Sequence, residues 1–110
     1  MAKQEKGTLP GSTSMLVLAL LKEREMYGYQ IIEELEKRSN QVFKLKEGTL
    51  YPILHGLEKD KLVTAQEREA PSGRVRRYYR VTAAGLRALE EKKEEWTVYS
   101  KAVTAILAGA

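Results

Sequence analysis

The chain of 110 residues has no cysteine, a single histidine and no long hydrophobic run. Without thiols it can form neither disulfides nor thiolate metal sites, which is typical of proteins in the reducing cytosol. It has no glycine-rich phosphate loop and no metal-ligand spacing, so we expect no cofactor, no metal and no enzyme activity. The longest apolar run, Met15 to Leu21, is too short to cross a membrane, and Met1 to Gly7 lacks the apolar segment of a signal peptide. These absences predict a cytoplasmic protein without a membrane partner.

Basic residues are concentrated in one short segment. A hydrophobic fraction of 43% suits one folded domain of this length, and the net charge is +4. Between Lys61 and Arg80 there are six basic and two acidic residues, so this segment alone carries an excess of four. Such an excess can simply aid solubility. A local basic stripe is also what a protein needs to bind the phosphate backbone of a nucleic acid.

The apolar pattern predicts four helices and one β-hairpin. For Met15 to Leu21 the periodicity also allows a strand, but the leucine and alanine content and the following Lys22 to Glu25 favour a helix. A second helix is expected over about Gly28 to Ser39, ended by a left-handed Asn40, and a third over about Glu47 to Lys59. The hairpin is expected to have strands over Leu62 to Glu69 and Arg74 to Val81, joined by a turn at Ala70 to Gly73. The last helix is expected over about Ala83 to Ala108, capped by Thr82.

The third helix has two distinct faces. Leu50, Ile53, Leu54 and Leu57 fall within an arc of roughly 100°, which predicts a buried stripe. The opposite side carries Gly48, Tyr51, Pro52, His55, Gly56 and Lys59. Pro52 is expected near the first turn, where its missing N–H costs little. An ordinary solvated face has no reason to carry two glycines, whereas a face that contacts another molecule does.

The second strand of the hairpin alternates between two kinds of side chain. Val75, Arg77, Tyr79 and Val81 are expected to pack, while Arg74, Arg76, Tyr78 and Arg80 form a cationic face. Arg77 therefore either pairs internally or contacts DNA. An arginine-rich edge that only prevents strand aggregation is the alternative.

Three short helices, a basic hairpin and a long helix follow the order of a winged helix-turn-helix domain. The fold is expected to be mainly α with a small β-hairpin: a tail over 1–11, the winged helix over 12–82, and a dimerisation helix over 83–110. In that geometry the third helix enters the major groove of duplex DNA and the hairpin lies along the backbone or minor groove. The predicted DNA-binding residues are Lys46, Gly48, Thr49, Tyr51, Pro52, His55, Lys59, Ser72, Gly73, Arg74, Arg76 and Arg77.

The final helix carries a seam with steps of three and four residues. The seam comprises Leu86, Leu89, Lys93, Trp96, Ser100, Val103 and Leu107. So long a helix has no evident partner within one small domain, so we expect it to meet a second copy through Leu89, Lys93, Trp96, Val103 and Leu107. Trp96 either packs in that interface or, with Met15 and Ser100, stacks on a flat aromatic effector between the subunits.

Three segments resemble the PadR family of transcriptional regulators. They are Met26 to Ile31, at the start of the second helix; Lys46 to Leu54 followed by Leu57 to Asp60; and Gly73–Arg74 followed by Arg77 to Thr82. Their order and spacing match over roughly Ser12 to Leu89. The resemblance implies a cytoplasmic homodimeric repressor, often autoregulated, that releases a pseudo-palindromic operator when a small hydrophobic or aromatic molecule binds. It also suggests the compact branch with one C-terminal helix, whose multidrug-responsive members carry an interface tryptophan where Trp96 falls. Lys61 departs from the family, which usually has glycine there.

A protein-interaction module built on the same fold is the alternative function. A winged helix need not bind DNA, and fold alone does not exclude this class. The hairpin discriminates between the two, because an interaction wing would expose apolar residues and this one is rich in arginine.

Overall fold

The computed structural model describes residues 12–109, so the predicted tail over 1–11 lies outside the described residues. The elements are α1 (Ser12–Glu23), β1 (Met26–Tyr27), α2 (Gly28–Arg38), α3 (Glu47–Lys59), β2 (Val63–Glu69), β3 (Val75–Val81) and α4 (Ala83–Leu107). The four helices and the hairpin predicted from the sequence are confirmed, with small differences at their ends. The first segment is a helix and not a strand, and it ends at Glu23 instead of extending through Glu25.

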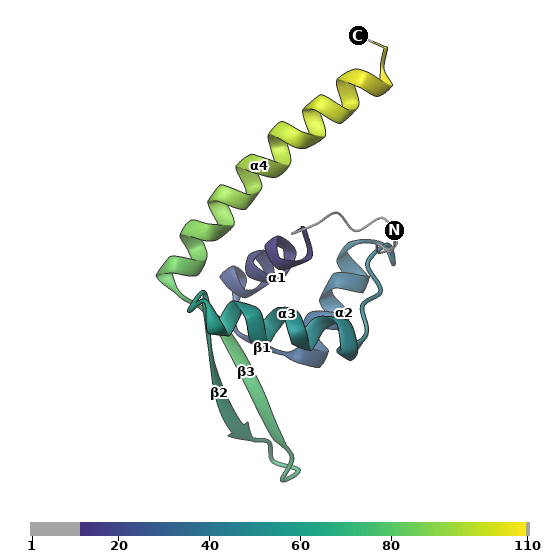
Figure 1. Cartoon of the computed structure of the whole chain (residues 1–110). Coiled ribbons are helices and arrows are strands. Elements are labelled where there is room, and N and C mark those ends of the chain that lie inside the picture. The colour runs from purple at the N-terminus through teal and green to yellow at the C-terminus, as the bar shows by residue number, and fades with distance from the viewer. Residues whose placement is uncertain (1–11, 110) are drawn as a thin grey trace.

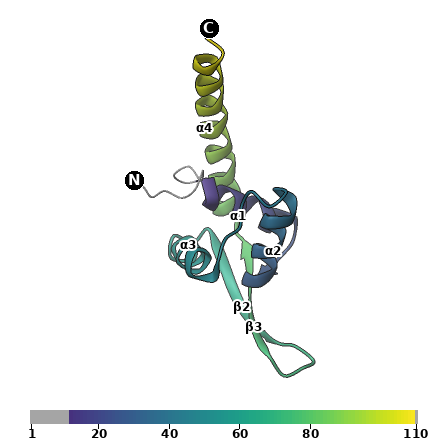
Figure 2. The ribbon, with the colours of Figure 1, turned by 90° about the vertical axis from the view of Figure 1, so that its right-hand side faces the viewer.

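Helix α1 lies at the centre of the helical body. It is apolar around most of its circumference, with Val17 and Leu18 fully buried, and it contacts each of the other three helices as well as β3. The hairpin projects from one end of this body and α4 from the other (Figures 1 and 2). The molecule is therefore elongated, measuring 57 × 28 × 24 Å. The helical body therefore holds the hairpin and α4 in fixed positions at its two ends.

A third strand, β1, completes the sheet. It pairs with β3 through Met26 and Tyr27, opposite Tyr79 and Tyr78, and the antiparallel order is β1-β3-β2. From the sequence, these two residues were expected at the start of the second helix. A two-residue strand has no periodicity, so nothing in the pattern marks it. Because β1 is so short, the part of β3 towards the hairpin tip, from Val75 to Arg77, has no strand of residues 12–109 on its outer edge.

The connections on both sides of the wing, residues 63–81, have defined caps. As predicted, Thr82 caps α4, since its Oγ1 accepts a hydrogen bond from the Gly85 amide at 3.0 Å. At the end of α3, the amide of Leu62 donates to the Leu57 carbonyl and that of Lys61 to the Glu58 carbonyl, at 2.9 and 3.0 Å. This is a Schellman motif, which favours glycine at the position Lys61 occupies, with φ of 63°. The motif explains why glycine is usual there and shows that lysine supports the same turn.

Candidate nucleic-acid interface

Helix α3 presents the two faces that its sequence predicts. Leu50, Leu54 and Leu57 are buried, and Ile53 is half-buried beside them. Six residues of the other side are exposed: Gly48, Thr49, Pro52, His55, Gly56 and Lys59. A side chain at either glycine would meet open space, so packing within the chain does not require glycine there. This face is therefore available to a ligand that approaches the backbone closely.

The expected position of Pro52 was wrong. The helix begins at Glu47 after the N-cap Lys46, so Pro52 is the sixth helical residue and lies in the second turn. There it cannot donate the usual hydrogen bond to the carbonyl of Gly48. This proline therefore removes a hydrogen bond within the helix, on the exposed face.

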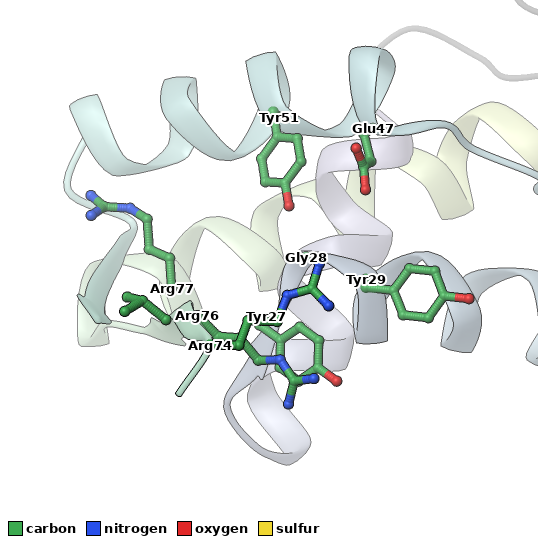
Figure 3. A pocket seen from close by; sticks show the side chains of 9 residues that line it. Tyr27, Gly28, Tyr29, Glu47, Tyr51, Arg74, Arg76 and Arg77 are labelled. Carbon is green, nitrogen blue, oxygen red and sulfur yellow. The ribbon is translucent and has the colours of Figure 1, made fainter. Parts of the chain in front are cut away.

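Tyr51 leans away from that exposed face. The Tyr51 ring is half-buried, and a Cβ on Gly28 would lie 2.5 Å from its hydroxyl oxygen. Gly28 thus lets the first turn of α2 approach α3. In Figure 3 the Tyr51 side chain points from α3 towards Gly28 and Tyr27.

A cleft of about 620 Å³ separates α3 from the uncovered edge of β3. Its lining comes from α3, the start of α2 and the wing: Tyr27, Gly28, Tyr29, Glu47, Tyr51, Arg74, Val75, Arg76 and Arg77 (Figure 3). Four of the residues predicted to bind DNA meet here, namely Tyr51, Arg74, Arg76 and Arg77. Tyr27, Tyr29 and Glu47 were missed. The sequence pattern does not reveal the turn that brings the two tyrosines to the cleft, and Glu47 was predicted only as the first residue of the helix.

The three arginines of the cleft have different environments. Arg74 makes no salt bridge within residues 12–109. The Arg76 guanidinium lies 4.5 Å from the centre of the Tyr27 ring, a cation–π contact that leaves its charge unneutralised. Arg77 donates to Glu58 of α3, with Nη2 2.7 Å from Oε2. The sequence left two roles open for Arg77, and in the structure this residue forms an internal ion pair. The hydrogen bond to Glu58 raises the pKa of Arg77.

The opposite face of the sheet is held by Glu25, which lies between α1 and β1. Its carboxylate accepts two hydrogen bonds from Arg68, one of them 2.9 Å long, and lies 3.5 Å from Arg80. The hydrogen bonds from Arg68 lower the pKa of Glu25 below its ordinary value. The Arg68 guanidinium also lies 4.7 Å from the centre of the Tyr78 ring. Three of the six basic residues counted in the sequence, Arg68, Arg77 and Arg80, are therefore paired with carboxylates of the helical body.

The burial of two wing residues differs from what the alternation predicts. Val75 was expected to pack, yet it is 60% exposed, because β3 has passed beyond the helical body at that point. Tyr78 lies on the cationic face as predicted, but it is half-buried there against Tyr27, with the ring centres 5.3 Å apart. The tip is as predicted: Ser72 and Gly73 are exposed, and the Gly73 amide donates to the Ala70 carbonyl at 2.8 Å.

Helix α4 is buried only in its first turns. Gly85 and Leu89 pack into the body, where Leu89 is 2% exposed, so the helix does have a partner within the domain, in α1. The C-terminal part of α4 projects away from the body (Figure 1). Trp96 is 41% exposed and Leu107 81%, while Val103 is half-buried.

Tyr99 was not part of the predicted seam on α4. Its ring stacks on Trp96 with the ring centres 6.0 Å apart, so the aromatic surface is wider than expected. Two polar seam residues bond within the helix, since Lys93 pairs with Glu90 and Ser100 donates to the Thr97 carbonyl. Met15, the third predicted effector residue, belongs to the core and is 9% exposed.

A basic hairpin beside an exposed helix, on a three-helix body, defines the class of winged helix DNA-binding proteins. The family model of the PadR-like transcriptional regulators matches residues 17–91. The chain therefore belongs to the PadR-like family of transcriptional regulators.

The chain is also similar to individual proteins of known sequence or structure. An uncharacterized protein of Lysinibacillus sphaericus is 33% identical over 99 residues, which cover 90% of this chain and 91% of that protein. A transcriptional regulator from Clostridium thermocellum superposes with a TM-score of 0.80 at 31% identity, covering 86% and 91% of the two chains. A PadR-like regulator from Bacillus cereus gives 0.77 at 32% identity, covering 91% and 95%. Within residues 12–109 no helix is long and apolar enough to span a membrane.

The Glu25 contacts predict how the stability of the wing responds to pH. The folded pKa of Glu25 lies below the ordinary 4.5, so its contribution is fully present above about pH 4.5 and is lost as the pH falls through the folded value. Glu25→Gln should lower the free energy of unfolding at pH 7, and its difference from wild type should shrink below pH 4.5. Urea unfolding between pH 7 and 3 measures this difference. The control Glu33→Gln, at a residue without a salt bridge in the described chain, should differ little from wild type at any pH, and a Glu25 effect independent of pH would contradict the assignment.

Proposed function

We propose that this protein is a homodimeric, sequence-specific repressor whose α3 enters the major groove while the wing follows the phosphate backbone. The observation that carries the proposal is the cleft between α3 and β3, which has on its wing side Arg74 and Arg76, two arginines without an acidic partner in the described chain. An α-helix fits the major groove, and arginine is suited to phosphate because it presents several N–H donors in a planar fork. Thr49, His55 and Lys59 lie on the exposed face of α3 and are the candidates for contacts to base edges or phosphates.

The second copy is supported by the exposed apolar surface of α4. Trp96, Tyr99, Val103, Ile106 and Leu107 lie on one side of a helix with 100° per residue. The exposed fraction is 51% for Tyr99 and 76% for Ile106, although both are large and apolar enough to favour burial. A symmetric pair of such helices covers this surface and places two copies of α3 on one duplex. Leu89, buried in the body, has little surface left to add.

Repression and its release follow from the same arrangement. Two copies of α3 bind both half-sites only when their separation matches about one helical turn of DNA, roughly 34 Å. A ligand at the dimer seam that favours another separation releases the operator, and it acts only through its differential affinity for the two states. The stacked Trp96 and Tyr99 form a surface suited to a flat aromatic effector.

The effector hypothesis predicts a change in the fluorescence of Trp96, the only tryptophan. Planar cationic or phenolic compounds should quench or shift the emission when they stack on the indole, and the same compounds should weaken operator binding. Tyr99→Ala should weaken both responses, because it removes the stacked partner. If no compound of a broad panel changes either the emission or operator binding, the hypothesis is rejected.

The DNA-binding proposal predicts a defined salt dependence. Selection from a random DNA pool should recover a pseudo-palindromic operator. For that operator, Arg74→Ala should reduce the slope of log K against log salt by about 0.9 per lost phosphate contact, or about 1.8 for a dimer. Lys101→Ala removes the same charge from the distal half of α4 and should leave the slope unchanged. Fluorescence anisotropy at salt concentrations from about 50 to about 300 mM measures the slope for both variants. An unchanged slope for Arg74→Ala would remove Arg74 from the contacts.

The dimer proposal predicts that a charge on the α4 seam separates the subunits. Val103→Asp should yield a monomer with greatly reduced operator affinity, because an unpaired carboxylate in an apolar interface costs several kcal/mol. Ala105→Asp adds the same charge on the opposite side of α4, about 200° away, and should remain dimeric. Light scattering gives the mass of each variant, and a wild-type monomer at micromolar concentration would contradict the proposal.

A further inference from the structure

Two carboxylates of the helical body hold the wing, one on each face of its sheet. Glu25 binds Arg68 and Arg80 on one face, and Glu58, in the last turn of α3, binds Arg77 on the other. Arg76 and Arg77 are adjacent in β3 and therefore point to opposite faces. The only ion pair between α3 and the wing in the described chain is the one between Glu58 and Arg77.

We propose that Arg77 is a positioning residue that fixes the distance between α3 and the wing through Glu58, and that it does not bind phosphate. The inference rests on the proposed DNA-binding function and divides the cleft arginines into two groups. Arg74 and Arg76 neutralise the backbone, while Arg77 sets the width of the cleft that receives it.

The charges around Arg77 make it a poor phosphate ligand. Its Nη2 lies 2.7 Å from Glu58, and its Nη1 lies 3.8 Å from Glu67 on the neighbouring strand. The guanidinium thus lies between two carboxylates, and the three groups together carry a charge of −1. A phosphate at this position would be repelled and would have to displace an existing short hydrogen bond. Arg74, which has no acidic partner in the described chain, presents the opposite situation.

The location of the pair makes it suited to positioning. Glu58 belongs to the same rigid helix as Thr49 and His55, and Arg77 belongs to the same strand as Val75. A contact between the last turn of α3 and β3 therefore determines how the DNA-facing side of the helix stands relative to the wing. Sequence-specific binding needs both in register with one duplex, whereas weak non-specific binding to phosphates does not.

The test compares Arg77→Gln, Glu58→Gln and the double variant with wild type. Each single variant should weaken binding to the selected operator about two- to fivefold per protomer, the range that exposed ion pairs contribute. The double variant should be no weaker than either single one, because both remove the same contact. None of the three variants should change the slope of log K against log salt, and their affinity for a random-sequence duplex should stay close to that of wild type. Thermal unfolding verifies that each variant is folded.

Glu69→Gln provides a matched control, because it removes the same charge from an exposed wing residue without a salt bridge in the described chain. Simple electrostatics predicts that losing a carboxylate near DNA strengthens binding, as Glu69→Gln should do slightly. Glu58→Gln should instead weaken binding to the operator. The inference is overturned if Glu58→Gln strengthens operator binding, or if Arg77→Gln lowers the salt slope as Arg74→Ala does. If wild-type protein binds no duplex at all, the proposed function itself fails, which is a distinct outcome.

Discussion

The burial of Tyr79 attaches the wing to the helical body, and the interface depends on this attachment. Tyr79 is 1% exposed although it lies in a strand with three arginines, and it pairs with Met26 on one side and Ala65 on the other. A buried aromatic side chain contributes a few kcal/mol, far more than an exposed ion pair. The hydrophobic contact therefore supplies the stability that keeps a cationic hairpin against the body. The surrounding ion pairs then act on its orientation.

The distribution of charge follows from this attachment. Near Tyr79, where β3 contacts the body, arginines meet carboxylates of the body and are neutralised by Glu25 and Glu58. Towards the tip, beyond the reach of the body, Arg74 has no acidic partner in the described chain and Val75 is exposed. The available positive charge is thus displaced to the end of the wing that projects farthest from the body.

Most of the fold was predictable because local sequence patterns determine its helices and its hairpin. The stripe of Leu50, Leu54 and Leu57 marked α3, and Thr82 marked the start of α4. The hairpin was marked by its turn. Strand β1 was missed, because two residues carry no period and their pairing with β3 is a long-range contact. The cleft was only partly predictable for the same reason. Tyr51 and the wing arginines were identified, whereas Tyr27 and Tyr29 reach the cleft through the β1–α2 junction, and Glu47 was predicted only as the start of α3. Pairing partners such as Glu25, 43 residues from Arg68, are likewise set by tertiary structure.

The turn that joins α3 to β2 uses a residue poorly suited to it. A left-handed backbone costs a residue with a Cβ about 1–2 kcal/mol relative to the right-handed form, and glycine largely avoids this cost. Lys61 occupies this conformation in every folded molecule, in an exposed position outside the cleft lining. The protein therefore folds below the stability that its own architecture allows. This unused margin lies in a connecting turn, where evolution or protein engineering has room to strengthen the scaffold without altering the surface that recognises its ligand.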